Sequence, residues 1–331
     1  MRAAFAIIVM LLIMGTATPV TSQSREKPLI IATIAPLGEI IKETFGDDVE
    51  VEILVPLGVD PHEYQLNPEQ IEKARNAIVI VTTGGHLPAE KKLKELSENG
   101  EINGLVLWID DYEMEGFKFL EKSWMGGNNP HGAWMDPKNA LAIAKATEKA
   151  LIKENPESRY VYERDYERFE YKVNEIVDSY RVVFQKIGVK KAIIELPAHQ
   201  YVLEWLGIES IDAIKPEEEV PAKSVDELLE GAKDADLIVY TIESPNSLKN
   251  AALELSSKSG KPLANVVYMW ANKPYTQVLK ENTGEIIKAL SEARGAGAVQ
   301  IKRGVSESYI FLALLIGIVM GFAFGMFVRR G

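Results

Sequence analysis

Residues 28–45 of the chain read PLIIATIAPLGEIIKETF. The first seven residues form a short, largely β-branched apolar run, which predicts a strand buried within a parallel sheet. The segment from Ala35 to Phe45 then becomes amphipathic and predicts a helix. A strand that leads directly into a helix is the first half of a β-α-β unit, in which helices cover the faces of a parallel sheet.

The same alternation continues along most of the chain. Apolar runs of strand length recur between helical patterns, first up to about residue 109 and again from residue 192. This repetition predicts an α/β protein with two lobes, each built on its own parallel sheet. The expected strands are 28–34, 49–55, 77–82, 105–109, 192–196, 208–211, 236–242 and 264–268.

Residues 157–187 separate the two alternating regions. The segment is charged, contains no Gly or Pro, and repeats its apolar residues at intervals of three and four. This spacing predicts one helix of about 30 residues, roughly 45 Å long, running along both lobes as a strut. The alternative is two helices with a break that the sequence does not mark.

Composition excludes several classes of function. The 331 residues carry a net charge of -11, which leaves no basic face for nucleic acid. They contain no cysteine, which rules out disulfides, zinc-thiolate sites, iron-sulfur clusters and attachment through a lipid-modified cysteine. Any bound metal must therefore be held by His, Asp, Glu or Asn.

The two ends of the chain predict where the protein is located. Residues 3–14 are an apolar run after Arg2, and small residues follow, so 1–24 is predicted to be a cleaved signal peptide with a polar spacer. An uncleaved N-terminal anchor is the alternative. Residues 309–328 contain no charge and are long enough to cross a bilayer. Arg329 and Arg330 would stay cytoplasmic, which leaves the body of the protein outside the cell membrane.

Four histidines are the candidate functional residues: His62, His86, His131 and His199. Two of them occupy near-duplicate settings, Asp-Pro-His at 60–62 and Asn-Pro-His at 129–131, where proline stiffens the loop. His62, His199 and Glu243 each follow a predicted strand, at the sheet edge where α/β proteins bind ligands. Neutral imidazoles converging from stiff loops predict a site for zinc or a similar transition metal.

Three motifs, in this order along the chain, carry a family resemblance. They are DPHEY at 60–64, NPHGAWMDP at 129–137 and HQYVLEWLG at 199–207. Together they resemble the metal-binding receptors of ABC transporters for zinc and manganese, over about residues 28–290. The resemblance implies two Rossmann-like lobes, 28–155 and 188–295, joined by one long rigid helix at 156–187 (the cluster A-I type). The sequence itself then predicts a linker, 296–308, before the membrane anchor at 309–328. It also implies that one divalent ion is captured outside the membrane and delivered to an ABC permease.

The resemblance also implies which residues hold the ion. His62, His131 and His199 fall at ligand positions of the family, and a histidine at the third position resembles its zinc branch, whereas the manganese branch tends to place a carboxylate there. Residues 268–272, where the family commonly has an aspartate, contain no acid. Glu243 is the expected fourth ligand, with His86 or water as alternatives. The bound ion is cargo, Zn²⁺ or else Mn²⁺, and no cofactor is expected.

Other functions fit parts of the sequence. A secreted zinc hydrolase would need a general base, such as Glu63 or Glu243, but the chain has no His-Glu-x-x-His pair, and a receptor that is not an enzyme is favoured. A metal-linked adhesin is a third possibility. The acidic run 217–219 is expected to be a solvated loop, and Trp124, Trp134 and Trp270 are expected to pack where the lobes meet.

Overall fold

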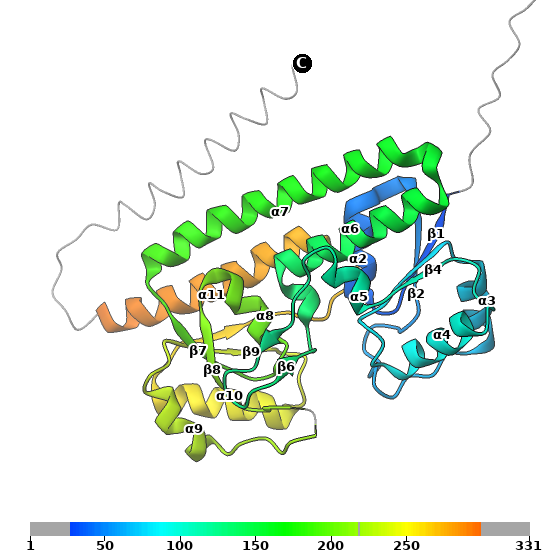
Figure 1. Cartoon of the computed structure of the whole chain (residues 1–331). Helices are drawn as coiled ribbons and strands as arrows, with labels where there is room; N and C mark the ends of the chain where they lie inside the picture. The colour runs from blue at the N-terminus through cyan, green and yellow to red at the C-terminus, as the bar shows by residue number, and fades with distance from the viewer. Residues whose placement is uncertain (1–26, 218, 299–331) are drawn as a thin grey trace, which may run out of the picture. The chain divides into compact units, whose positions relative to one another are not determined.

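The computed structural model describes residues 27–217 and 219–298 (Figure 1). Within these residues the chain forms two four-stranded parallel sheets with helices packed on them, and one two-stranded antiparallel hairpin. The expected α/β class with parallel sheets is confirmed. The chain divides into two compact units, each with one of the parallel sheets.

Unit 1 comprises residues 27–118, 137–175 and 269–276. Its sheet has the order β2-β1-β3-β4, and neighbouring strands are all parallel. The strands are β1 (Leu29–Ala32), β2 (Glu50–Ile53), β3 (Val79–Val81) and β4 (Leu105–Leu107). The helices wholly within the unit are α2 (Ala35–Phe45), α3 (Pro68–Asn76), α4 (Pro88–Glu98), α5 (Ile109–Glu113) and α6 (Pro137–Glu154), with short 3-10 turns at η1 (Gly46–Asp48) and η3 (Pro156–Ser158).

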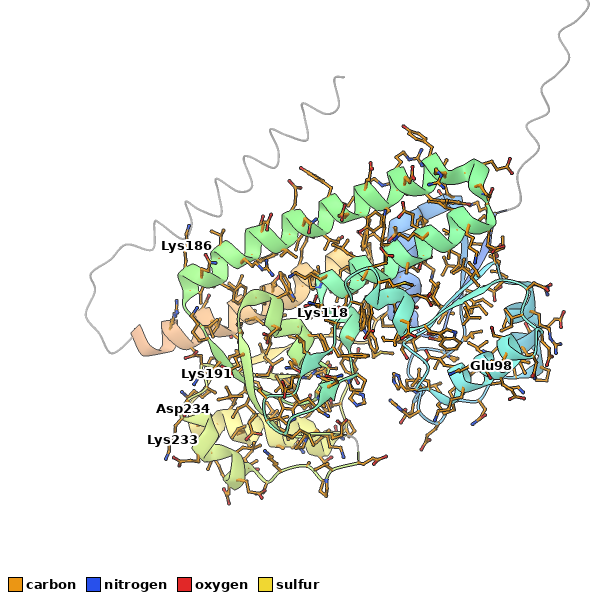
Figure 2. All side chains as sticks on the ribbon, viewed as in Figure 1. Glu98, Lys118, Lys186, Lys191, Lys233 and Asp234 are labelled. Atoms are coloured by element: carbon orange, nitrogen blue, oxygen red, sulfur yellow. The ribbon has the colours of Figure 1, made fainter. Side chains whose placement is uncertain are left out.

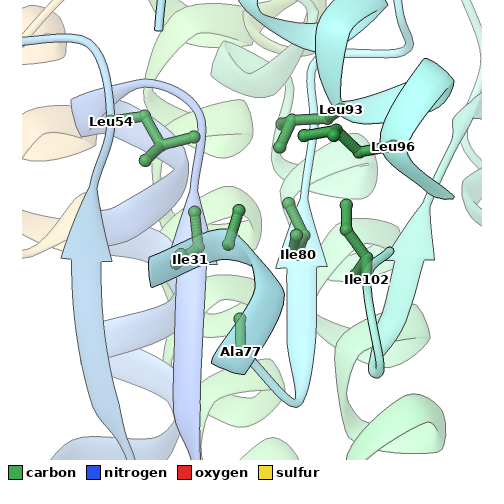
Figure 3. Packing of buried hydrophobic residues seen from close by; sticks show 8 residues of the cluster. Ile31, Leu54, Ala77, Ile80, Leu93, Leu96 and Ile102 are labelled. Atoms are coloured by element: carbon green, nitrogen blue, oxygen red, sulfur yellow. The ribbon is translucent and has the colours of Figure 1, made fainter. Parts of the chain in front are cut away.

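One face of this sheet packs against α3 and α4. Ile31 of β1 and Ile80 of β3 are paired in register and point to the same side, where Leu93 and Leu96 of α4 cover them (Figure 3). All four side chains are 3% exposed or less, and burying each contributes roughly 1.5–3 kcal/mol to stability. The apolar run at 28–34 therefore forms a central strand because its side chains are buried on both faces.

Unit 2 comprises residues 119–136, 176–217, 219–268 and 277–298. Its sheet has the order β10-β9-β7-β8, and its core joins Ile193 of β7 and Ile238 of β9 to Leu228 and Leu255 of the covering helices. The strands are β7 (Lys191–Ile194), β8 (Glu209–Ala213), β9 (Leu237–Tyr240) and β10 (Leu263–Asn265), and β5 (Leu120–Glu121) pairs with β6 (Asn128–Asn129). The remaining elements are η2 (Ala133–Met135), α8 (His199–Leu203), η4 (Glu204–Leu206), α9 (Val225–Ala232), α10 (Asn246–Ser259) and α11 (Tyr275–Ala298).

Both sheets have the same topology. In each, the first two strands in sequence lie side by side, and the third strand pairs on the other side of the first. The order therefore reverses between β1 and β3 in unit 1 and between β7 and β9 in unit 2. In open parallel sheets, ligands bind at the carboxyl ends of the strands beside such a reversal.

The amino edge of the unit 2 sheet has a different character. Lys191, at the start of β7, and Lys233 and Asp234, which precede β9, are all exposed (Figure 2). The backbone carbonyl of Lys191 accepts from the N–H of Asp236, which fixes the start of β9 at this edge. A solvated edge of mixed charge requires no bound ligand, whereas open parallel sheets bind ligands at the carboxyl edge.

The long helix is α7, which runs without interruption from Arg159 to Ile187 over 29 residues. The prediction of one helix is confirmed, and the alternative with a break is wrong. Along its buried side lie Phe169 and Val173, which are 1% exposed or less, as the three-and-four spacing predicts. The boundary between the two units falls inside this helix, after Glu175.

Two segments group differently from the expected lobes. Residues 119–136 were expected in the N-terminal lobe but belong to unit 2, because the backbone N–H of Leu120 donates to the hydroxyl of Tyr201 at 2.9 Å. Residues 269–276 belong to unit 1, because Thr276 donates its backbone N–H to Glu43 at 2.9 Å. Both segments are fixed by hydrogen bonds between residues far apart in sequence, which local patterns do not reveal.

The expected membrane segments fall mostly beyond this part of the chain. None of the helices in residues 27–217 and 219–298 combines the length and apolar character needed to cross a membrane. The predicted signal peptide, 1–24, and the predicted anchor, 309–328, lie outside the described residues. The expected linker starts inside α11, which continues to Ala298.

Candidate metal centre

The two X-Pro-His loops have the same local structure. The Asp60 carboxylate accepts a hydrogen bond from the backbone N–H of His62 at 2.9 Å, and the Asn129 side-chain oxygen accepts from that of His131 at 3.1 Å. Each is an Asx turn, in which a short side chain takes the place of a backbone carbonyl. The predicted stiff presentation of both histidines is therefore supported by a specific hydrogen bond as well as by proline.

In unit 1, His62 lies near His86. Their ring centroids are 5.8 Å apart and the ring planes are inclined at 39°. The loop before His86 is fixed by Glu90, a buried carboxylate that accepts from the Thr33 hydroxyl at 2.7 Å and the Thr83 N–H at 2.6 Å. Unit 1 thus places two imidazoles together, one following β2 and one following β3.

In unit 2, the loops that carry His131 and His199 are joined by Asn129. Its buried amide donates to the carbonyl of Pro197 at 2.9 Å and to the side chain of Gln200 at 2.8 Å. Gly132 sits so close to Ala198 that an added Cβ would lie 2.6 Å from the Ala198 Cβ. The structure therefore brings the second and third motifs into direct contact, although about 70 residues separate them.

His199 is completely buried. Burial lowers the pKa of its ring to about 3, so the imidazole is neutral, the form that binds metal. Its Nδ1 accepts from the Leu196 N–H at 3.4 Å, and its ring lies edge-on to Tyr268, with centroids 5.8 Å apart. Among the described residues, no group hydrogen-bonds to its buried Nε2.

An unsatisfied buried polar atom costs about 1–3 kcal/mol, so a native structure retains one for a reason. A lone pair offered by Nε2 of His199 would suit a metal ion. While Nδ1 accepts from Leu196, the neutral ring carries its proton on Nε2. Metal binding at Nε2 would therefore move this proton to Nδ1 and break the long contact with Leu196.

His131 is mostly buried and has a carboxylate neighbour. Its Nε2 lies 2.6 Å from Oε1 of Glu217, and the Nζ of Lys122 contacts the other oxygen of this carboxylate. The expectation of a solvated acidic loop is wrong for Glu217, because Lys122, only 7% exposed, requires a negative partner. Glu217 follows β8 at the carboxyl edge, and this position could have identified it.

Two glutamates follow neighbouring strands of the unit 2 sheet, and only one of them is buried. Glu243 is exposed, and its backbone N–H contacts the Thr241 hydroxyl at 3.5 Å. Glu195, directly after β7, is fully buried instead and accepts from the Thr241 N–H at 2.7 Å. Burial raises the pKa of the Glu195 carboxyl, and its Oε1 has no hydrogen-bond partner among the described residues. The position of Glu195, directly after an apolar strand and before a loop, is the sequence signal that could have identified it.

The complete ligand set stays a prediction. Within the described residues, no three His, Asp or Glu side chains form a group able to hold a metal. His62 belongs to unit 1, whereas His131, His199 and Glu243 belong to unit 2. Within unit 2, one scaffold supports both the His131 loop and the His199 loop. The Trp134 indole adds to it by donating to the Tyr268 carbonyl at 3.0 Å, which holds residue 268 against the His131 loop.

Comparison with known proteins identifies the family. Residues 30–289 match the family described as zinc-uptake complex component A, periplasmic. This range covers most of the chain and includes all three motifs.

Relatives and solved structures agree with this match. The iron ABC transporter substrate-binding lipoprotein MtsA of Streptococcus pyogenes serotype M1 is 27% identical over 304 residues, covering 86% of this chain and 96% of the relative. The manganese ABC transporter substrate-binding lipoprotein PsaA of Streptococcus pneumoniae serotype 4 is 27% identical over 233 residues, covering 67% and 74%. The crystal structure of ZnuA superposes with a TM-score of 0.63 at 21% identity, covering 81% of this chain and 99% of that one, which shows the likeness of the fold.

The Asx turns provide a test of the unit 2 scaffold. Asn129→Ala should destabilise the protein by about 2–4 kcal/mol, because it leaves the His131 N–H, the Pro197 carbonyl and Gln200 without their shared partner. Asp60→Ala removes the equivalent turn at an exposed position and should cost less than about 1 kcal/mol. Denaturant unfolding of both variants measures the difference, and equal costs would contradict the role given to Asn129.

Proposed function

Because the chain belongs to the zinc-uptake complex component A family, we propose that it is an extracytoplasmic receptor that captures one divalent transition metal ion and delivers it to an ABC permease. Zinc is the proposed cargo. The receptor role makes the protein a binding component and not an enzyme, and membership of this family favours it over a secreted hydrolase or an adhesin.

The observation that carries this proposal is the buried Nε2 of His199, which has no hydrogen-bond partner in the described part of the chain. A satisfied core histidine would use both ring nitrogens. The neutral ring, the adjoining His131 loop and the Asn129 hydrogen bonds all favour a role in binding. We propose His62 from unit 1, and His131 and His199 from unit 2, as nitrogen ligands. One carboxylate would complete the set, the role that the sequence assigns to Glu243.

Zinc fits such a set better than manganese does. Zn²⁺ accepts four ligands and binds imidazole well, whereas manganese prefers oxygen donors and a higher coordination number. One observation favours manganese as the second candidate: the unpartnered oxygen of Glu195 lies at the same sheet edge and would suit a harder ion. Relatives named for iron and for manganese leave the choice of ion to experiment.

The test is metal binding by the full-length chain in detergent. One zinc ion should bind per chain, and His199→Ala should weaken binding about 100-fold or more, since it removes a ligand rather than an outer contact. His86→Ala serves as the comparison and should change affinity by less than about tenfold. Chelator competition and elemental analysis measure both quantities. A chain that retains no metal, or a His199→Ala variant of unchanged affinity, would contradict the proposal.

We further propose that the receptor is held at the outer face of the cell membrane by residues 309–328, followed by Arg329 and Arg330. The relatives are named lipoproteins, but the 331 residues of this chain contain no cysteine to carry a lipid. An uncharged run of about 20 residues can cross a bilayer and would serve the same purpose.

Truncation tests this anchor. A chain ending at Glu307 should be secreted into solution, should keep its zinc affinity within about threefold, and should no longer sediment with membranes. The expected retention of binding follows because the ligand candidates all precede this point by more than 60 residues. Membrane association or loss of folding in the shortened chain would show that residues 309–328 are not a simple anchor.

A further inference from the structure

The β5-β6 hairpin is fixed both to β8 and to the loop that follows it. The Trp124 indole donates to the carbonyl of Pro216 at 3.1 Å, the Ser123 hydroxyl donates to the carbonyl of Ser210, and Lys122 contacts the carboxylate of Glu217. These side chains are consecutive in the hairpin, while Ser210 lies near the start of β8 and Pro216 and Glu217 lie in the loop that follows it. The loop is therefore held in place on the same hairpin that leads into His131.

This attachment brings the carboxylate of Glu217 into contact with His131, a proposed metal ligand. Oε1 of Glu217 lies 2.6 Å from Nε2 of His131, and Oε2 contacts Nζ of Lys122. The His131 and Glu217 side chains are 18% and 21% exposed, so the contact is largely shielded from water. Lys122 occupies one oxygen and leaves the other directed at the imidazole.

We infer that Glu217 is the oxygen ligand of the bound ion, in the place that the sequence assigned to Glu243. This inference rests on the proposed function. Zn–N and Zn–O bonds of about 2.0–2.2 Å at a tetrahedral angle separate the two ligand atoms by roughly 3.3 Å. To bind both atoms, a zinc ion would replace the proton between His131 and Glu217, and the two atoms would move apart by about 0.7 Å.

The chemistry of the arrangement supports this assignment over Glu243. Three neutral imidazoles leave both charges of the ion uncompensated, and a carboxylate in a shielded position offsets one of them. Glu243 is exposed, whereas Glu217 is largely shielded and lies against His131. Because Lys122 holds Oε2, Glu217 would bind through Oε1 alone.

The contact between Glu217 and His131 has a second interpretation, in which Glu217 only neutralises Lys122 and competes with the metal for His131. The two interpretations predict opposite changes in zinc affinity when Glu217 is replaced. If Glu217 is a ligand, Glu217→Gln should weaken zinc binding about 100-fold or more, since a residue that only orients His131 would cost about 10- to 100-fold. If it is a competitor, the same substitution should strengthen binding.

The experiment measures zinc affinity of the full-length chain in detergent by chelator competition, for the wild type, Glu217→Gln, Glu217→His and Glu219→Gln. Glu219 is an exposed acid of the same loop and controls for the loss of charge. We expect weaker binding for Glu217→Gln, recovery to within about fivefold of the wild type for Glu217→His, which restores a donor, and no change for Glu219→Gln. Thermal unfolding of each metal-free protein identifies any variant whose affinity falls only because it unfolds.

The outcomes separate this inference from the proposed function. If the wild type binds zinc and Glu217→Gln binds it with equal or higher affinity, the role of Glu217 is overturned and the receptor assignment stays intact. Equal losses in Glu217→Gln and Glu219→Gln would also overturn it, because general charge would then explain the effect. Wild-type protein that binds no zinc would instead overturn the proposed function.

Discussion

The hydrogen bonds of the Asn129 side chain are the constraint on which the arrangement of the candidate ligands in unit 2 depends. One buried amide closes the turn that presents His131 and holds the loop that begins α8 with His199. Its interior position makes each of these bonds costly to lose. Asp60, the equivalent exposed residue of unit 1, only closes the turn that presents His62. Two loops that are distant in sequence therefore behave as one support for two imidazoles.

The repeated topology explains why the chemistry gathers at one edge of each sheet. A buried carboxylate bridges the strand reversal in both units: Glu90 contacts Thr33 and Thr83 after β1 and β3, and Glu195 reaches Thr241 from β7 to β9. Glu90 has both oxygens satisfied by hydrogen bonds. Glu195 retains an unpartnered oxygen in the described chain. In unit 2 this oxygen and the unpartnered Nε2 of His199 both belong to the segment that directly follows β7.

Much of this architecture could be predicted from sequence, because it depends on local patterns. Apolar runs such as 28–34 identify central strands, the spacing in 157–187 identifies α7, and proline beside Asp60 or Asn129 identifies the rigid histidine turns. The rest depends on contacts between distant segments. No local signal shows that 119–136 packs in unit 2, or that Lys122 is buried and draws Glu217 out of solvent. Glu195 was missed because a single acid at the end of an apolar strand looks like an ordinary boundary.

X-ray absorption at the zinc edge of the loaded full-length chain would show whether His62, His131 and His199 together hold the proposed cargo ion. The absence of cysteine simplifies the measurement, since no thiolate can contribute to the donors around the ion. We expect four nitrogen or oxygen donors at about 2.0–2.1 Å, with the more distant scattering of three imidazoles. A six-coordinate shell dominated by oxygen, or scattering from fewer than three imidazoles, would contradict it.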